Sequence, residues 1–331
     1  MGNSNAKEDP DLGRMVTLSR SDPGSVIDDV DRVLPYLTEE SYQERKRASE
    51  IVLNLSKNNP AKLSEYFDAL SRYIREVDSA IQLDLVRACN EMRGYISDGS
   101  LRTHREVFLS LLVDKDSSEE LLESAAGVIS DIARVDPTAA APHVDRIALL
   151  LYSDVPGVAV NALRALESIA KHDASVVSPY TDELFKTIEY SAIPEENRLA
   201  LSILGYVAVS NPTEIDDRKF VSVARELALS EHEIVTSEAV KEIGLVIADR
   251  PEMADDLLDI VVRNMNSSFE QTRRQAMIEC LRIANFEPQL FGEVENIDPS
   301  YVSRIVSQLI DECNYESQVP EALELANEIG G

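Results

Sequence analysis

Short residue pairs that interrupt helices recur along this chain at a nearly fixed interval. The pairs are Asn59-Pro60, Asp98-Gly99, Asp136-Pro137, Asp173-Ala174, Asn211-Pro212, Arg250-Pro251 and Glu287-Pro288. Successive pairs lie 39, 38, 37, 38, 39 and 37 residues apart. A period near forty, in a chain with few strand signals, indicates stacked helical hairpins, because one hairpin cannot bury its apolar face alone.

A helix, here called B, is predicted just before each pair. We align the copies on small or apolar anchors at Ala48, Ala88, Ala125, Ala162, Ala200, Val240 and Ala276. Seven residues after the anchor stand Leu55, Tyr95, Ile132, Ile169, Val207, Ile247 and Ile283. Positions three, four and eight residues after the anchor are also mostly apolar. At the position three residues after the anchor, the exceptions are Glu91 and Glu279. This is the stripe of an amphipathic helix.

A second helix, called A, is predicted after each pair. Proline cannot continue helix B but suits the first turn of the next helix, and the Asn or Asp before it is a good N-cap. Pro142 and Pro179 stand about five residues into their A helices and are expected to kink them or delay their start. The first A helix is expected to begin near Ser25, and the last B helix to end near Ala284.

These limits divide the chain into three parts. Residues 1–23 are expected to form a flexible polar leader, and residues 24–288 seven A–B hairpins. Residues 289–331 are expected to form a linker and a C-terminal helical cap, with helices at about 299–313 and 319–329. A cap of this kind covers the apolar face that the last repeat would otherwise expose.

The repeats resemble the HEAT-repeat, or armadillo-like, family over roughly residues 25–288. Parts of that family's second-helix pattern match Asp154, Val158, Ala162, Leu163 and Ala165, and also Arg45, Ala48, Arg273 and Ala276. Most copies lack the Val-Arg pair of the family pattern. The resemblance implies an all-α, right-handed α-solenoid in which B helices line the concave face. It does not imply one activity, since such repeats serve as scaffolds, adaptors, transport factors and sometimes nucleic-acid enzymes.

The chain is strongly acidic, with 60 Asp and Glu against 32 Lys and Arg and a formal charge of −28. Such a surface repels nucleic acid and anionic lipid, because phosphates are bound by Lys and Arg. Molar salt shortens the Debye length to about 3 Å and screens the self-repulsion. The low lysine content resembles proteins of halophilic archaea, and an acidic protein of an ordinary cell is the alternative.

The residues that carry chemistry do not form a recognisable catalytic motif. Cys89, Cys280 and Cys313 are far apart, and the histidines fall in four different repeats without metal-ligand spacing. No phosphate-binding glycine loop, nucleophile elbow or membrane-length apolar run occurs. We therefore predict a non-enzymatic protein without cofactor or metal. The absence of a secretory signal pattern favours a cytoplasmic location without membrane insertion.

Basic residues are relatively frequent in the B helices, which hold 11 basic and 11 acidic residues, whereas the other 240 residues hold 21 and 49. This balance suggests a groove that is less repulsive towards an acidic partner, although chance also produces such a deviation. The candidate partner-binding residues are Arg45, Arg47, Arg87, Arg93, Arg164, Arg198, Lys241, Arg274 and Arg282.

The sequence favours a scaffold or adaptor that binds another protein along its B-helix surface. The first alternative is a nucleic-acid- or chromosome-associated repeat protein. The basic clusters near Arg45 and Arg274 lie at opposite ends of the array and do not form the continuous stripe that duplex DNA requires. A second alternative, an enzyme or cofactor-maturation factor on the same repeats, would need a pocket with converging polar groups.

Overall fold

The computed structural model describes residues 11–114, 117–155, 157–286 and 290–293, together with Ser300 and Arg304. It consists of helices throughout these residues, with no strand among them. The chain divides into two compact units, residues 1–165 and 166–331, and the boundary falls inside one B helix.

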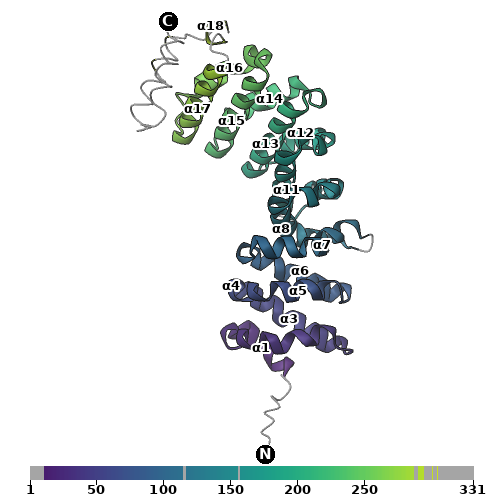
Figure 1. The fold of residues 1–331 in the computed structure, drawn as a ribbon. Coiled ribbons are helices and arrows are strands. Elements are labelled where there is room, and N and C mark those ends of the chain that lie inside the picture. Colours follow the sequence, from purple (N-terminus) through teal and green to yellow (C-terminus); the bar gives the residue numbers. More distant parts are fainter. Residues whose placement is uncertain are drawn as a thin grey trace, which may run out of the picture. The chain divides into compact units, whose positions relative to one another are not determined.

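All seven predicted B helices are present (Figure 1). They are α3 (Tyr42–Asn58), α6 (Ser79–Met92), α8 (Glu119–Val135), α11 (Val158–His172), α13 (Pro194–Ser210), α15 (Glu233–Asp249) and α17 (Glu270–Phe286). Within unit 1, α3 packs on α6 and α6 on α8; within unit 2, α13 packs on α15 and α15 on α17. The anchors Ala48, Ala125, Ala200 and Ala276 are buried in these contacts.

The A segments lie beside them and are more broken. Their α-helical parts are α2 (Val30–Val33), α4 (Pro60–Leu63), α5 (Phe67–Ile74), α7 (Asp98–Val113), α9 (Pro137–Ala140), α10 (Val144–Leu149), α12 (Thr181–Tyr190), α14 (Asp217–Leu227) and α16 (Ala254–Asn264). Pro142 lies in a 3₁₀ turn between α9 and α10, and Pro179 in one that precedes α12. Of the two predicted effects, a break in the helix is found at Pro142, where α9 has already begun, and a delayed start is found at Pro179.

The predicted N-cap hydrogen bond from Asn or Asp at the start of the A segment is present at some corners and absent at others. The carboxylates of Asp136 and Asp173 accept hydrogen bonds from the backbone N–H groups of Ala139 and Ser175. These bonds and those to neighbouring hydroxyls lower the pKa of both aspartates. Asn59 ends α3 without a side-chain cap bond, so its effect comes from the proline that follows it.

The leader prediction is wrong for part of its length. Leu12–Ser21 form helix α1, which packs against α3 with Leu12, Met15 and Ser19 buried. Ser19 also accepts a hydrogen bond from the Asn54 amide of α3 at 3.0 Å. Burial against α3 stabilises a short helix that its polar composition would not hold in isolation. Thus α1 takes the place that a preceding B helix would occupy.

The alignment needs correction in two repeats. N-caps at Ser41, Ser118 and Ile193 stand seven residues before the anchors of their helices. The same spacing from the N-caps Asp78 and His232 selects Leu85 instead of Ala88, and Ala239 instead of Val240. Helix α6 accordingly ends at Met92, and Tyr95, predicted to be part of the apolar stripe, is 59% exposed.

The predicted C-terminal cap, with helices at about 299–313 and 319–329, lies outside the described residues apart from Ser300 and Arg304. Within the predicted linker, α18 (Leu290–Glu293) is a short helix in which Phe291 is fully buried.

Candidate functional site: the B-helix surface

The sequence-predicted basic residues of unit 1 join neighbouring repeats. The Arg45 guanidinium lies 3.0 Å from the Asp78 carboxylate and also donates to the carbonyls of residues 39 and 40. Arg87 pairs with Glu120 across the α6–α8 contact. Arg93 lies 3.9 Å from Asp131 and donates to the Gly127 carbonyl and the Asn161 amide oxygen. These cations are therefore already balanced by carboxylates of the next repeat.

The most buried carboxylate in these contacts belongs to Asp84, and its partner is Lys46, which was not among the predicted partner-binding residues. The Lys46 ammonium lies 2.6 Å from the Asp84 carboxylate, which also accepts a 2.6 Å hydrogen bond from the Ser49 hydroxyl. Asp84 is only 6% exposed. A buried carboxylate needs such partners, because an unpaired charge in the interior is costly.

The remaining predicted residues of unit 1 are exposed. Arg47 lies on the surface of α3, and Arg164 on the surface of α11. The nine candidate residues thus do not gather at one point.

In unit 2 the predicted residues belong to a polar network along the B helices. Arg198 forms a bidentate pair with Glu195, at 2.9 and 3.1 Å, and lies 3.7 Å from Glu238 of the next helix. The Lys241 ammonium lies 2.8 Å from Glu238 and 3.0 Å from Glu242. At the end of the row, Arg274 pairs with Glu270 at 2.7 Å and Arg282 with Glu279 at 3.0 Å.

The same network reaches α11. The Ser202 hydroxyl donates to Glu167 of α11 at 3.0 Å, and it lies 3.4 Å from a carboxylate oxygen of Glu242. Lys171 pairs with Glu167 at 3.1 Å and stands 5.8 Å from the centre of the Tyr206 ring. Polar groups therefore connect α11, α13 and α15 without a break.

Two glutamates of this network are buried, which the sequence did not predict. Glu242 is 1% exposed and Glu279 is fully buried. In the corrected alignment both stand three residues after their anchors, at Ala239 and Ala276. Each lies against a glycine of the preceding B helix: Glu242 against Gly205, and Glu279 against Gly244. The missing side chain leaves the space that each glutamate fills.

Burial changes how these carboxyl groups hold protons. It raises the pKa of Glu242 to about 8, although the Lys241 ammonium opposes the change. It likewise raises the pKa of Glu279 to about 7, against the effect of Arg282 and the Gln275 amide. For Glu238, the lysine and arginine partners outweigh burial and lower the pKa. At neutral pH the two buried glutamates are therefore largely protonated or half-protonated, and Glu238 is ionised.

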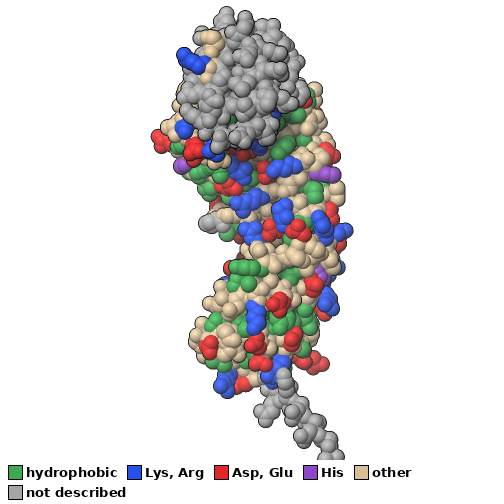
Figure 2. Space-filling view, turned by 60° about the vertical axis from the view of Figure 1, so that its left-hand side comes forward, with side chains coloured by type: hydrophobic (Ala, Val, Ile, Leu, Met, Phe, Trp, Pro, Cys, Tyr) green, Lys and Arg blue, Asp and Glu red, His purple; other side chains and the backbone are tan. Residues whose placement is uncertain are grey.

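The face shown in Figure 2 has Lys and Arg side chains interspersed with Asp and Glu. This agrees with the pairing described above and differs from a single basic stripe. A surface of this kind presents fixed charges of both signs, and it offers hydrogen-bonding groups whose positions are set by their pairs.

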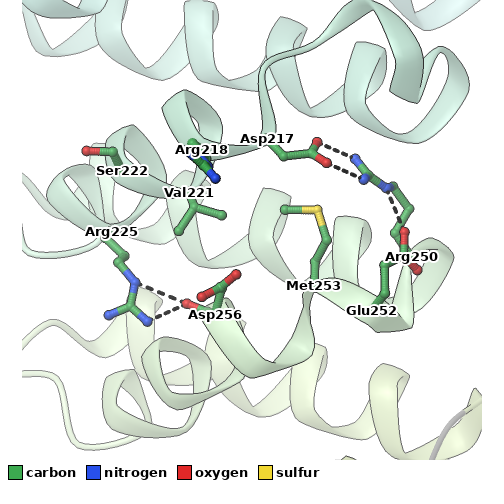
Figure 3. A pocket seen from close by; sticks show the side chains of 9 residues that line it. All are labelled: Asp217, Arg218, Val221, Ser222, Arg225, Arg250, Glu252, Met253 and Asp256. Carbon is green, nitrogen blue, oxygen red and sulfur yellow. Dashed lines mark hydrogen bonds and ion pairs between the residues drawn. The ribbon is translucent and has the colours of Figure 1, made fainter.

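A separate cavity of about 580 Å³ lies among A-layer residues of unit 2, between α14 and α16 (Figure 3). Two of its arginines already have hydrogen-bond acceptors. Arg250 donates two 2.8 Å hydrogen bonds to the Asp217 carboxylate, and Arg225 donates to the Asp256 carbonyl. Val221 and Met253 supply apolar lining. The lining residues provide neither a cysteine nor a histidine, so the cavity has no candidate nucleophile or imidazole base.

The cysteines Cys89 and Cys280 and the histidine His104 are packed against other parts of the fold. Cys89 and Cys280 are buried, and burial raises the pKa of both thiols well above its ordinary value. His104 lies 3.2 Å from Asp68 and packs edge-on against Phe67. Among the described residues, no group of three His, Cys, Asp or Glu side chains is placed to hold a metal. Within the same residues, no helix has both the length and the apolar character needed to span a bilayer.

No family model matches the chain, and neither does any curated protein sequence. Solved structures do match its fold. An engineered protein is 16% identical with a TM-score of 0.70, covering 96% of this chain and 93% of its own. A designed armadillo repeat protein is 18% identical with a TM-score of 0.54, covering 66% and 99%. A structure of computationally designed armadillo repeat proteins for modular peptide recognition is 18% identical with a TM-score of 0.52, and the match covers 65% of this chain and 99% of that one. This chain therefore has an armadillo/HEAT-like helical repeat fold.

Proposed function

We propose that this protein is a non-catalytic scaffold that binds an extended segment of another protein along its B-helix surface. The observation that carries the proposal is the row of oriented charged side chains that successive B helices present. Arg198 and Lys241 are both held by Glu238, and Arg282 is held by Glu279. Side chains fixed in this way lose little conformational freedom on binding, which favours recognition.

The repeat geometry suits an extended chain. Packed helices lie about 8–10 Å apart, and an extended peptide advances about 3.3 Å per residue. Each B helix would therefore meet about three residues of a bound segment. The likeness to proteins designed for modular peptide recognition supports the same class of partner. The pairing of the basic residues favours a protein with charges of both signs over nucleic acid, which presents negative phosphates.

Site-specific photo-crosslinking tests this proposal. A photoreactive residue would replace Arg47 or Ile278, which are exposed on B helices of unit 1 and unit 2. The control position is Arg263, whose side chain is 67% exposed on α16. In extract of the source cell, at its native salt concentration, both B-helix positions are expected to yield the same discrete protein adduct, and the control none.

Two results would contradict the scaffold assignment. One is an adduct that is removed by nuclease, which would favour the nucleic-acid alternative. The other is the same set of protein adducts at Arg263 as at Arg47 and Ile278, or no protein adduct at either B-helix position. The protein is expected to pass through a DNA column at the same salt concentration.

A further inference from the structure

Exposed apolar side chains recur at the turns from A to B helices, outside the B-helix surface. In unit 2, Tyr190 is 78% exposed and Leu229 is 66% exposed. Tyr190 is the last residue of α12, and Leu229 stands two residues after the end of α14, 39 residues further along the chain. Ile193 and Ile234, at 44% and 47%, lie just beyond them at the starts of α13 and α15. Large apolar side chains grouped in this way mark interaction surfaces more often than isolated ones do.

A groove lies between α12 and α14, and its lining residues end one position before Tyr190 and three positions before Leu229 along the chain. Its volume is about 410 Å³, and Phe185, Ile188 and Val223 form its apolar lining. At the end of the groove farther from the turns, the charges are already paired. The Lys219 ammonium lies 3.1 Å from the Asp182 carboxylate and 5.7 Å from the centre of the Phe185 ring. This groove is distinct from the cavity between α14 and α16 shown in Figure 3.

The end nearer the turns is acidic. Glu189 and Glu226 line it, one from each helix, and both are exposed. Neither carboxylate forms an ion pair with a described residue. Lys186, one turn before Glu189 on α12, also lines the groove, whose lining thus holds Lys186 and Lys219 against Asp182, Glu189 and Glu226. The stretches 189–197 and 226–234, which span the two turns and the adjoining helix ends, together contain six glutamates and no Lys or Arg; of these, Glu195 is paired with Arg198 and Glu196 is buried.

We infer that this edge of unit 2, the groove between α12 and α14 together with Tyr190 and Leu229, which follow its lining residues Glu189 and Glu226 along the chain, docks a basic amphipathic segment of another protein. An apolar side chain of that segment would enter the groove and pack against Ile188 and Val223. A Lys or Arg beside it would pair with Glu189 and Glu226. Charge complementarity selects this occupant, because a second copy of a chain with charge −28 would bring acidic groups against the acidic turns.

The inference does not depend on the proposed function of the B-helix surface, and the two are tested by different variants. The probe is a fluorescent synthetic helix of two Leu-Lys-Lys-Leu-Leu-Lys-Leu repeats, with a Glu-for-Lys peptide as its counterpart. Binding to the full chain would be measured by anisotropy at about 0.15 M and about 1 M salt, where Debye lengths are about 8 Å and 3 Å.

Two double variants remove the two halves of the surface. Tyr190→Ser with Leu229→Ser removes the apolar anchors, and Glu189→Gln with Glu226→Gln removes the carboxylates. Each is expected to weaken binding of the Lys peptide roughly tenfold or more, as for central anchors of an interface. The apolar variant should show this loss at both salt concentrations, and the charge variant mainly at the lower one.

Matched controls separate this site from general attraction to an acidic protein. Glu65→Gln with Glu76→Gln changes the net charge equally at exposed sites of unit 1, and Tyr95→Ser with Leu149→Ser removes exposed apolar groups of unit 1. Both should bind the Lys peptide within about twofold of the unchanged protein. Equal weakening in the controls, equal binding in all variants, or equally tight binding of the Glu peptide would overturn the inference. Circular dichroism would establish that each variant is folded.

Discussion

Between pH 5 and pH 8 the folded protein is expected to lose several kcal/mol of stability, chiefly through Glu242 and Glu279. Both carboxyl groups have a pKa of 4.5 when freely solvated, and burial in the B-helix layer raises it to about 8 and about 7. In this interval the folded protein therefore holds protons that the unfolded chain releases. Stability is fully present below the unfolded pKa and falls as pH rises through the folded values, by about 1.4 kcal/mol for each pKa unit.

Groups with lowered pKa act in a different interval. Asp98, Asp136, Asp173 and Asp217 are held ionised by hydrogen bonds or arginine partners, so their contribution is lost only as pH falls below the normal carboxyl range. They should not affect the change between pH 5 and pH 8.

Urea unfolding at constant salt measures this effect. The double variant Glu242→Gln with Glu279→Gln keeps the size of both side chains and, like the protonated carboxyl group, offers both a donor and an acceptor, but it cannot ionise. Its free energy of unfolding should vary much less between pH 5 and pH 8 than that of the unchanged protein. Glu65→Gln, on the exposed surface of unit 1, serves as the control and should keep the original profile. An identical pH profile for the double variant would contradict burial of these two groups.

Replacing Gly244 by Ala is expected to destabilise the protein by about 1–3 kcal/mol, the usual range for overpacking a close contact. A Cβ at this position would stand 2.5 Å from both Cβ and Cγ of Glu279, so α15 and α17 would have to separate. The overlap outweighs the roughly 1 kcal/mol by which Ala is preferred over Gly inside a helix. Gly99 of α7 provides the control, because a Cβ there meets only the Ser97 hydroxyl at 3.8 Å. Gly99→Ala should be neutral or stabilising.

Second-site variants of Glu242 and Glu279 identify which of their atoms would overlap the Cβ added at Gly205 or Gly244. At Gly205 the added Cβ would overlap the carboxylate end of Glu242 but lie 3.2 Å from its Cβ. Glu242→Ala should therefore relieve most of the overlap caused by Gly205→Ala. Glu279→Ala should relieve less of that caused by Gly244→Ala, because the Cβ of residue 279 remains. Urea unfolding of both double-mutant cycles gives the coupling energies. Equal stability of Gly244→Ala and Gly99→Ala would show that α15 and α17 do not approach as closely as described.

Much of the helical architecture follows from local signals in the sequence. A proline after Asn59, Asp136 or Asn211 cannot continue a helix, and the apolar stripe before it must face other helices. These two constraints locate α3, α8 and α13 without tertiary information. The short A segments were also foreseeable in part, because Pro142 and Pro179 prevent a regular start.

The first helix was missed for an identifiable reason. The prediction starts the first A helix near Ser25 and places no helix before it, although Asp22-Pro23 stands 37 residues before Asn59-Pro60 and has the same form. By the rule applied to the other pairs, it also closes a B-type helix, and α1 does end at Ser21. The few apolar residues of α1 gave a weak stripe, so the interruption signal was the stronger clue.

The candidate site was less predictable. The surplus of basic residues in B helices was visible, but pairing across repeats depends on which side chains face each other after stacking. In unit 1, Lys46 meets Asp84, 38 residues along the chain. Glu279 looked like an exception to the apolar stripe, and Glu242 was hidden by a one-residue error in alignment. The glycines at 205 and 244, spaced by one repeat, were the signal that could have revealed both buried glutamates.

Hydrogen–deuterium exchange of the full protein, resolved along the chain by mass spectrometry, tests the stacked-repeat arrangement most directly. Slow exchange is expected over α3, α6, α8, α11, α13, α15 and α17, because their backbone hydrogen bonds lie in the layer that each unit buries most completely. Protection should recur every 37–40 residues and drop at Asn59, Asp136 and Asn211. Protection that ignores this period, or exchange through the B helices as fast as at those corners, would contradict the stacked repeats.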